Sequence, residues 1–174
     1  MNARKAIFLD RDGVINQEQS YVCSPEEFVM LPQVPEAIRL IKEAGFLAVV
    51  ITNQSAIAQG MFSEQTLIKI HQKMTAALSQ ENVCLDGIYY CPHHPSVSPC
   101  TCRKPQNGML IQAQKELNID FQGSWMIGDH GRDIECGKSV GLNTIAIGDP
   151  QTWPYTVKPD YFFSSLFDAI PLLI

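Results

Sequence analysis

Two aspartates separated by one residue follow the first apolar run of the chain. Asp10 and Asp12 belong to the segment Asp-Arg-Asp-Gly, which comes directly after Ala6–Leu9. In extended backbone, side chains two residues apart lie on the same side. Paired carboxylates can supply a nucleophile and a proton donor, or they can hold a cation. An Asp-x-Asp-Gly segment after a strand is often only a turn, so this pair needs support from the rest of the chain.

That support comes from polar residues that follow two further apolar runs. Thr52 and Asn53 come after Leu47–Ile51, and Asp129 follows Trp125–Ile127 with one glycine between them. Each segment alone can be a turn or a helix cap. The carboxyl ends of parallel strands, however, face one crevice, where ligands bind. We therefore expect these residues to converge with the two aspartates.

The carboxylates in this group indicate a metal ion. Three neighbouring carboxylates repel one another and stay partly protonated unless a cation neutralises them. A site with oxygen ligands and room for water suits Mg²⁺. Neither histidine nor cysteine joins the group, which disfavours zinc at this position.

A second group of potential metal ligands lies in residues 91–106, the one long irregular stretch. It holds the pairs Cys91/His93 and Cys100/Cys102. Three thiolates and one imidazole can form a closed tetrahedral zinc site of the structural kind. The spacing differs from that of common zinc fingers, so from the residues alone free thiols or a disulfide remain open. A proline-containing loop with few apolar residues nevertheless has no other evident means of ordering itself.

The elements that position these residues alternate along the chain. Short apolar runs predict strands over 6–9, 47–51, 87–90, 125–127, 144–147 and 161–163, and helical spacing predicts helices from Pro35, from Ser63, over 108–117, over 132–140 and from Ser165. This alternation predicts an α/β fold with a three-layer, Rossmann-like parallel sheet and helices on both faces. We expect residues 1–174 to form a single domain, because the chain is too short for two ordinary domains or a large cap domain.

The composition narrows the class of protein. The 174 residues are 45% hydrophobic and carry a net charge of −5, which argues against nucleic-acid or membrane binding as the main role. The chain shows no signal peptide and no apolar run long enough for a membrane span, so we expect a cytoplasmic protein, and a monomer. In that compartment the six cysteines are thiols or metal ligands rather than disulfides. We expect Cys23, Cys84 and Cys136 to be small packing residues.

Four motifs in this order resemble those of haloacid dehalogenase-type phosphatases. They are Asp10-x-Asp12-Gly13-Val14, Thr52-Asn53-Gln54, Arg103-Lys104-Pro105 and Gly128-Asp129-x-x-x-Asp133. The resemblance covers nearly the full chain. Within the superfamily the sequence is most similar to the branch of heptose bisphosphate phosphatases and histidinol-phosphate phosphatases, which carry a similar zinc-clipped loop.

The resemblance implies a Mg²⁺-dependent phosphomonoester hydrolase that works through an aspartyl-phosphate. The resemblance implies that Asp10 is the nucleophile and that Asp12 acts as acid and base. The implied Mg²⁺ ligands are Asp10, the Asp12 carbonyl and Asp129, and the implied substrate and phosphate contacts are Thr52, Asn53, Arg103 and Lys104. The implied ligands of a structural Zn²⁺ are Cys91, His93, Cys100 and Cys102. Asp133 is expected to orient its loop rather than to touch the metal.

The implied substrate is a small phosphorylated sugar. The stretch Thr52–Gly60 is closer to the heptose branch, which implies removal of the 7-phosphate of a heptose 1,7-bisphosphate. Ala56, Gln59 and His130 depart from the pattern of that branch, where glycine, arginine and lysine are usual. Histidinol phosphate or another small metabolite is the alternative substrate. A non-catalytic zinc scaffold would require loss of a catalytic residue, and a phosphoacceptor of the response-regulator kind would need neither Asp12 nor the cysteine loop.

Overall fold

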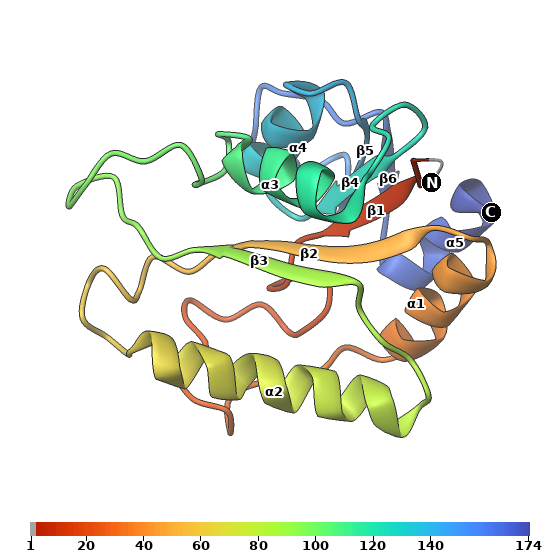
Figure 1. Ribbon diagram of the computed structural model, residues 1–174. Helices are drawn as coiled ribbons and strands as arrows, with labels where there is room; N and C mark the ends of the chain where they lie inside the picture. The colour runs from red at the N-terminus through yellow and green to blue at the C-terminus, as the bar shows by residue number, and fades with distance from the viewer. Residues whose placement is uncertain (1–2) are drawn as a thin grey trace.

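The computed structural model describes residues 3–174 and contains one six-stranded parallel sheet with helices on both faces (Figure 1). In chain order the elements are β1 (Ala6–Leu9), α1 (Val34–Glu43), β2 (Leu47–Asn53), α2 (Glu64–Gln80), β3 (Gly87–Cys91), α3 (Gly108–Leu117), β4 (Trp125–Gly128), α4 (Gly131–Lys138), β5 (Asn143–Ile147), β6 (Tyr161–Phe163) and α5 (Leu166–Leu173). The predicted α/β fold with three layers is confirmed.

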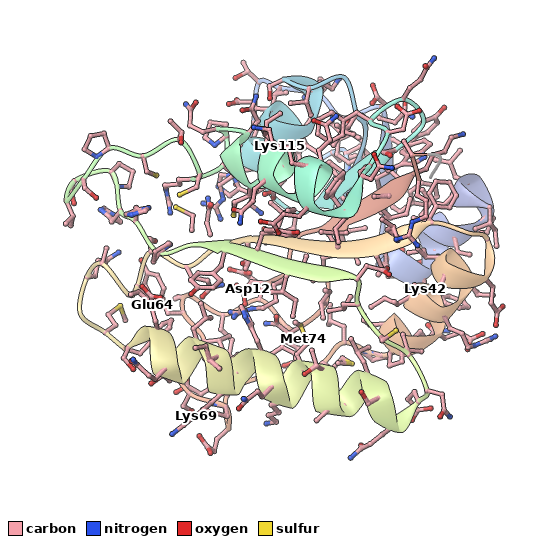
Figure 2. All side chains as sticks on the ribbon, in the orientation of Figure 1. Asp12, Lys42, Glu64, Lys69, Met74 and Lys115 are labelled. Atoms are coloured by element: carbon pink, nitrogen blue, oxygen red, sulfur yellow. The ribbon has the colours of Figure 1, made fainter. Side chains whose placement is uncertain are left out.

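Successive side chains of each strand point to opposite faces of the sheet, which explains why helices cover both faces. In β1, Ile7 and Leu9 pack into the core beneath α1, α2 and α5, whereas Ala6 and Phe8 pack into the core beneath α3 and α4. Figure 2 shows the same division on α2, where Met74 points toward the sheet and Lys69 points away from it. Since both faces of the sheet are covered, β1 is buried along its whole length, as expected for a parallel strand that is apolar throughout.

The strand order β3-β2-β1-β4-β5-β6 determines where a ligand can bind. The chain moves outward from β1 to β3 through α1 and α2, then crosses back past β1 through α3 to start β4. Since crossovers are right-handed, the reversal puts α3 and α4 on the opposite face. The reversal creates a switch point between β1 and β4, where Leu9 pairs with Ile127. The residues that follow these two strands therefore meet at the place where open sheets bind ligands.

The ends of several elements differ from the prediction by one or two residues. β2 extends to Asn53 because Thr52 and Asn53 pair with the end of β3. The helix predicted over 132–140 runs from Gly131 to Lys138, and His130 caps it by accepting a hydrogen bond from the Arg132 amide. The predicted cap of α2 is confirmed, because the Ser63 hydroxyl accepts from the Thr66 amide at 3.2 Å.

Irregular connections occupy the carboxyl end of the sheet. The segments 10–33, 54–63 and 92–107 follow β1, β2 and β3 and contain no helix or extended strand. Figure 1 shows the connections after β2 and β3 extending from the same end of the sheet. In the part of the chain that the structure describes, these connections contain no large cap domain. Within residues 3–174 no helix is both long enough and apolar enough to cross a membrane.

Candidate active site

The carboxylates of Asp10 and Asp129 meet at the switch point, as predicted. They form a cluster with Asp133 in which one oxygen of each residue lies within 4.8 Å of the others. The Asp10 amide donates to the Ile127 carbonyl at 2.9 Å, which fixes the chain end of β1 beside β4. Gly13 makes room for the cluster: a Cβ at that position would lie 2.1 Å from Asp129 Oδ2.

The electrostatics of this cluster favour a bound cation. Burial, followed by the charges of Asp10 and Asp133, raises the pKa of the Asp129 carboxyl to about 8. Burial also raises the pKa of Asp10, although the neighbouring Lys104 ammonium lowers it in part. Both shifts arise because negative charge is concentrated away from water. Asp10 and Asp129 therefore offer hard oxygen donors that need positive charge, and this donor set fits Mg²⁺.

Lys104 lies beside Asp10 and is fully buried. Its ammonium contacts Asp10 Oδ2 at 2.9 Å and Asp133 Oδ1 at 2.7 Å, and it donates to the Ile51 carbonyl at 2.7 Å. Three oxygen atoms thus surround the ammonium. Lys104 is therefore a counterion of the aspartates in this state, and its predicted contact with phosphate stays a prediction.

Thr52 and Asn53 hold the site together from the end of β2. Thr52 is buried, and its hydroxyl oxygen accepts from Gln54 Nε2 at 2.9 Å. Asn53 forms two hydrogen bonds with the backbone of Lys104, donating to its carbonyl at 3.1 Å and accepting from its amide at 3.0 Å. Asn53 thereby fixes the loop segment that carries the lysine, and it also lines the crevice.

Asp12 lines the same crevice, but its carboxylate is not part of the aspartate cluster. The chain turns immediately after β1, so the extended geometry that would place Asp12 directly beside Asp10 ends at Leu9. Asn16 Nδ2 donates to Asp12 Oδ1 at 2.9 Å, and Gln54 Nε2 donates to Oδ2 at 3.0 Å. Asp133 occupies the third carboxylate position instead, and its Oδ2 also accepts from the His130 amide at 3.0 Å.

The crevice is lined by charged residues, and two of them, Glu18 and Arg132, were not predicted from the sequence. Its walls carry both acidic and cationic side chains, contributed by Asp10, Asp12, Glu18, Asp129, Arg103 and Arg132. Arg103 was predicted to face the substrate, whereas Glu18 and Arg132 were missed. A sequence signal existed for Arg132 alone, because it lies within the Gly-Asp-x-x-x-Asp motif.

The predicted zinc ligands come together in the connection after β3. One donor atom from each of Cys91, His93, Cys100 and Cys102 lies within 4.8 Å of the others. The closest pairs are Cys102 Sγ to Cys91 Sγ at 2.9 Å and His93 Nδ1 to Cys102 Sγ at 3.2 Å. His94 stays outside this group, with its Nδ1 at 2.6 Å from the Ser96 hydroxyl. Three sulfurs and one nitrogen in this proximity fit a closed zinc site.

The three remaining cysteines, which were predicted to be packing residues, differ in how deeply they are buried. Cys136 is buried among apolar side chains, so the expectation of a packing role is confirmed for it. Cys84 is exposed and Cys23 is half-buried, so that expectation is wrong for Cys84. Cys84 lies in the irregular connection between α2 and β3.

Sequence comparisons agree with these features. A family model described as HAD-hydrolase-like matches residues 101–169. The D-glycero-beta-D-manno-heptose-1,7-bisphosphate 7-phosphatase of Yersinia pestis is 42% identical over 172 residues, which cover 94% of this chain and 92% of that protein. The enzyme of the same name from Escherichia coli K12 is 41% identical, with 94% and 90% covered.

The fold comparison leads to the same group of proteins. The crystal structure of D,D-heptose 1,7-bisphosphate phosphatase from B. bronchiseptica, complexed with magnesium and phosphate, superposes with a TM-score of 0.90 at 34% identity and covers 97% of each chain. Identity above 40% over nearly the whole length, together with the same architecture, establishes common descent. The chain belongs to the haloacid dehalogenase-like hydrolases, in the family of the heptose 1,7-bisphosphate 7-phosphatases.

Proposed function

We propose that this protein is a Mg²⁺-dependent phosphatase that removes the 7-phosphate of D-glycero-D-manno-heptose 1,7-bisphosphate. The observation that carries the proposal is the pairing of Asp10 with the buried Lys104, at a crevice that Asp12 also lines. The buried ammonium favours the ionised, nucleophilic form of the Asp10 carboxyl against the effect of burial, and it holds the carboxylate in place. The names of the relatives support the choice of substrate.

The proposed reaction has two steps. In the first, an Asp10 carboxylate oxygen bonds to phosphorus as the bond from phosphorus to the sugar oxygen breaks, and the Asp12 carboxyl gives its proton to that oxygen. In the second, water attacks phosphorus, Asp12 takes a proton from the water, and the bond to Asp10 breaks to release inorganic phosphate. Splitting the displacement in two lowers each barrier, and the positioned acid and base contribute about 10²–10⁴-fold.

Asp10, Asp129 and the Asp12 backbone carbonyl are the proposed Mg²⁺ ligands. The ion would supply positive charge that offsets repulsion between the carboxylates and the phosphoryl oxygens. The pKa of Asp129, raised to about 8 by burial and by neighbouring carboxylates, supports this assignment because such a site requires a counter-charge. Thr52 and Lys104 are the proposed contacts of the transferred phosphoryl group.

Two arginines support a substrate with a second phosphate. Arg103 and Arg132 both line the crevice, from the loop after β3 and from the start of α4 respectively. A guanidinium binds phosphate oxygens in a forked manner. Histidinol phosphate would instead bring an ammonium group next to these cations, which disfavours it as a substrate.

Phosphate release in the presence of Mg²⁺ tests the proposal. We expect kcat/KM for the heptose bisphosphate to exceed that for histidinol phosphate by more than about 100-fold, or roughly 2.7 kcal/mol of transition-state discrimination. Removal of Mg²⁺ by a chelator should stop turnover, and Mg²⁺ should restore it. Similar, slow rates on both substrates would contradict the assignment of the sugar and leave the phosphatase chemistry in place.

Replacing Gly13 by alanine tests the metal assignment. The added Cβ would meet Asp129 Oδ2, and the backbone there has φ +76°, so we expect weaker Mg²⁺ activation as well as lower stability. Gly45→Ala is the matched control, because Gly45 has φ +88° with nothing within 4 Å of an added Cβ. The control should lose only the ~1–2 kcal/mol of a left-handed backbone. Equal Mg²⁺ dependence in the two variants would contradict the role of Asp129.

Cys91, His93, Cys100 and Cys102 are the proposed ligands of a structural Zn²⁺. We expect Cys100→Ser to lose most bound zinc and to lower Tm, because metal binding contributes folding free energy in sites of this kind. Cys84→Ser is the matched control, since Cys84 is exposed and outside the cluster. Zinc content and Tm measured on both proteins decide the assignment, and unchanged zinc in Cys100→Ser would refute it.

The domain organisation, the location and the oligomeric state of the enzyme are also part of the proposal. The chain covers 90–97% of the relatives compared above, so we propose that residues 1–174 act as a single phosphatase domain. The proposed state is a cytoplasmic monomer without a nucleic-acid or membrane partner, in agreement with the net charge of −5. Size-exclusion chromatography with light scattering tests the monomer.

A further inference from the structure

We propose that Arg11, supported from behind by His71 of α2, is the positioning residue that orients the Asp12 carboxylate for proton transfer. This inference rests on the phosphatase function proposed above. It concerns a side chain that takes no part in the reaction as described so far.

The contact between Arg11 and Asp12 is a forked ion pair. Arg11 Nη2 donates to Asp12 Oδ1 at 2.8 Å and to Oδ2 at 2.9 Å, and Arg11 Nε donates to Oδ1 at 3.2 Å. A planar guanidinium that binds both oxygens fixes the plane of the carboxylate as well as its position. Hydrogen bonds from Asn16 and Gln54 complete the surroundings of the same carboxylate.

The exposed fractions of the two side chains show that the Arg11 guanidinium lies on the buried side of the Asp12 carboxylate. The Arg11 side chain is 1% exposed, whereas that of Asp12 is 23% exposed. Asp12 lines the crevice, and Arg11 does not. The guanidinium therefore holds the face of the carboxylate turned away from substrate and leaves the other face available. An arginine that bound substrate directly would have the opposite exposure.

His71 provides the second contact of the guanidinium. Its Nε2 lies 3.5 Å from Arg11 Nη1, and its ring packs against Tyr90 with the ring centroids 6.0 Å apart. Burial, and next the charge of Arg11, lower the pKa of His71 to about 4, so the ring is neutral near pH 7 and can accept a hydrogen bond. Figure 2 shows Asp12 on the α2 side of the sheet, where this chain of contacts begins.

Orientation matters because proton transfer depends on short, aligned contacts. An aspartate on a turn after a strand can otherwise adopt several rotamers. The neutral donors of Asn16 and Gln54 bind one oxygen each and cannot define the plane of the carboxylate. Lysine would keep the charge at position 11 but would act as a point charge without the fork. Arg11→Lys thus separates geometry from charge.

Two substrates with different leaving groups provide the test. The sugar oxygen needs a proton as it departs, whereas p-nitrophenolate, from p-nitrophenyl phosphate, departs without one. The ratio kcat/KM reports steps up to the first irreversible one, here loss of the leaving group. We expect Arg11→Lys to lower kcat/KM for the heptose bisphosphate by about 100-fold, near the lower end of acid–base contributions, and to change it less than about threefold for p-nitrophenyl phosphate. Asp12→Asn should show the same selectivity with a larger loss.

The controls separate a positioning role from a structural one. Arg39→Lys, at an exposed arginine that pairs with Glu36 and Glu43, should leave both substrates unaffected. Equal losses on both substrates in Arg11→Lys, or no loss on either, would overturn the inference. If Arg11→Lys does not fold, His71→Leu decides: a selective loss on the heptose substrate supports the inference, and its absence overturns it. A parent protein inactive on both substrates would instead contradict the proposed function itself.

Discussion

Asp10→Asn is expected to lower kcat for phosphate release by at least about 10⁴-fold, the scale of loss when a catalytic nucleophile is removed. The amide of asparagine is a poor nucleophile and cannot form the aspartyl-phosphate. It also removes one charge from the aspartate cluster, where burial already raises the pKa of Asp10. The fold should therefore survive, and the substituted protein should be as stable as the parent when no Mg²⁺ is added. Phosphate release and Tm measured on the same samples check both statements.

The comparison with Asp12→Asn sharpens this prediction. Without its acid the enzyme can still form the covalent intermediate from p-nitrophenyl phosphate, whereas without Asp10 it cannot act on either substrate. Activity of Asp10→Asn within tenfold of the parent would assign the nucleophile to another residue. Loss of activity together with a collapse in Tm would mean that the Asp10 carboxylate also stabilises the fold.

Lys104→Met is expected to have the second largest effect, on stability and on activity together. Methionine has a similar length but leaves Asp10 and Asp133 without their shared counterion in the interior. Breaking one partner of a buried pair costs about 3–5 kcal/mol. For a chain of this length that corresponds to a fall in Tm of roughly 6–20 °C. Activity should fall by at least about 100-fold, because the nucleophile loses the donor that orients it.

Lys138→Met is the matched control for this substitution. Lys138 pairs with Asp160 at 3.3 Å, but both side chains are 41% exposed. Exposed pairs contribute at most about 1 kcal/mol, so Tm should change little. Adding Asp133→Asn to Lys104→Met should recover part of the lost stability, since one uncompensated charge disappears. No difference between the two lysine variants in thermal unfolding would contradict the counterion role.

The fold and the convergence of the site were predictable for one physical reason. Buried parallel strands are apolar on both faces, so the polar residues Asp10, Thr52 and Asp129 stood out where those runs ended. Parallel strands then bring their carboxyl ends to one edge, which made their proximity predictable without coordinates. The grouping of Cys91, His93, Cys100 and Cys102 was implied by the family resemblance, because from the residues alone free thiols or a disulfide remained open.

Other parts of the site depend on information that the linear sequence does not carry. Arg11 is charged and lies between two aspartates, and only the turn after β1 decides that its side chain points into the interior. The same turn takes the Asp12 carboxylate out of the cluster and lets Asp133 enter it from α4. Such outcomes depend on backbone direction at single residues, which hydrophobic periodicity does not report.

The two hydrogen bonds between Asn53 and the backbone of Lys104 have a thermodynamic consequence. Lys104 lies two residues after Cys102, so the proposed zinc site and the lysine beside Asp10 share one short span of chain. A crevice ligand that favours this arrangement of the span would raise the affinity of the proposed zinc site, and by linkage zinc would raise the affinity for that ligand by the same factor. Inorganic phosphate should therefore slow the removal of zinc by a chelator, and Asn53→Ala, which uncouples the span from β2, should diminish that protection.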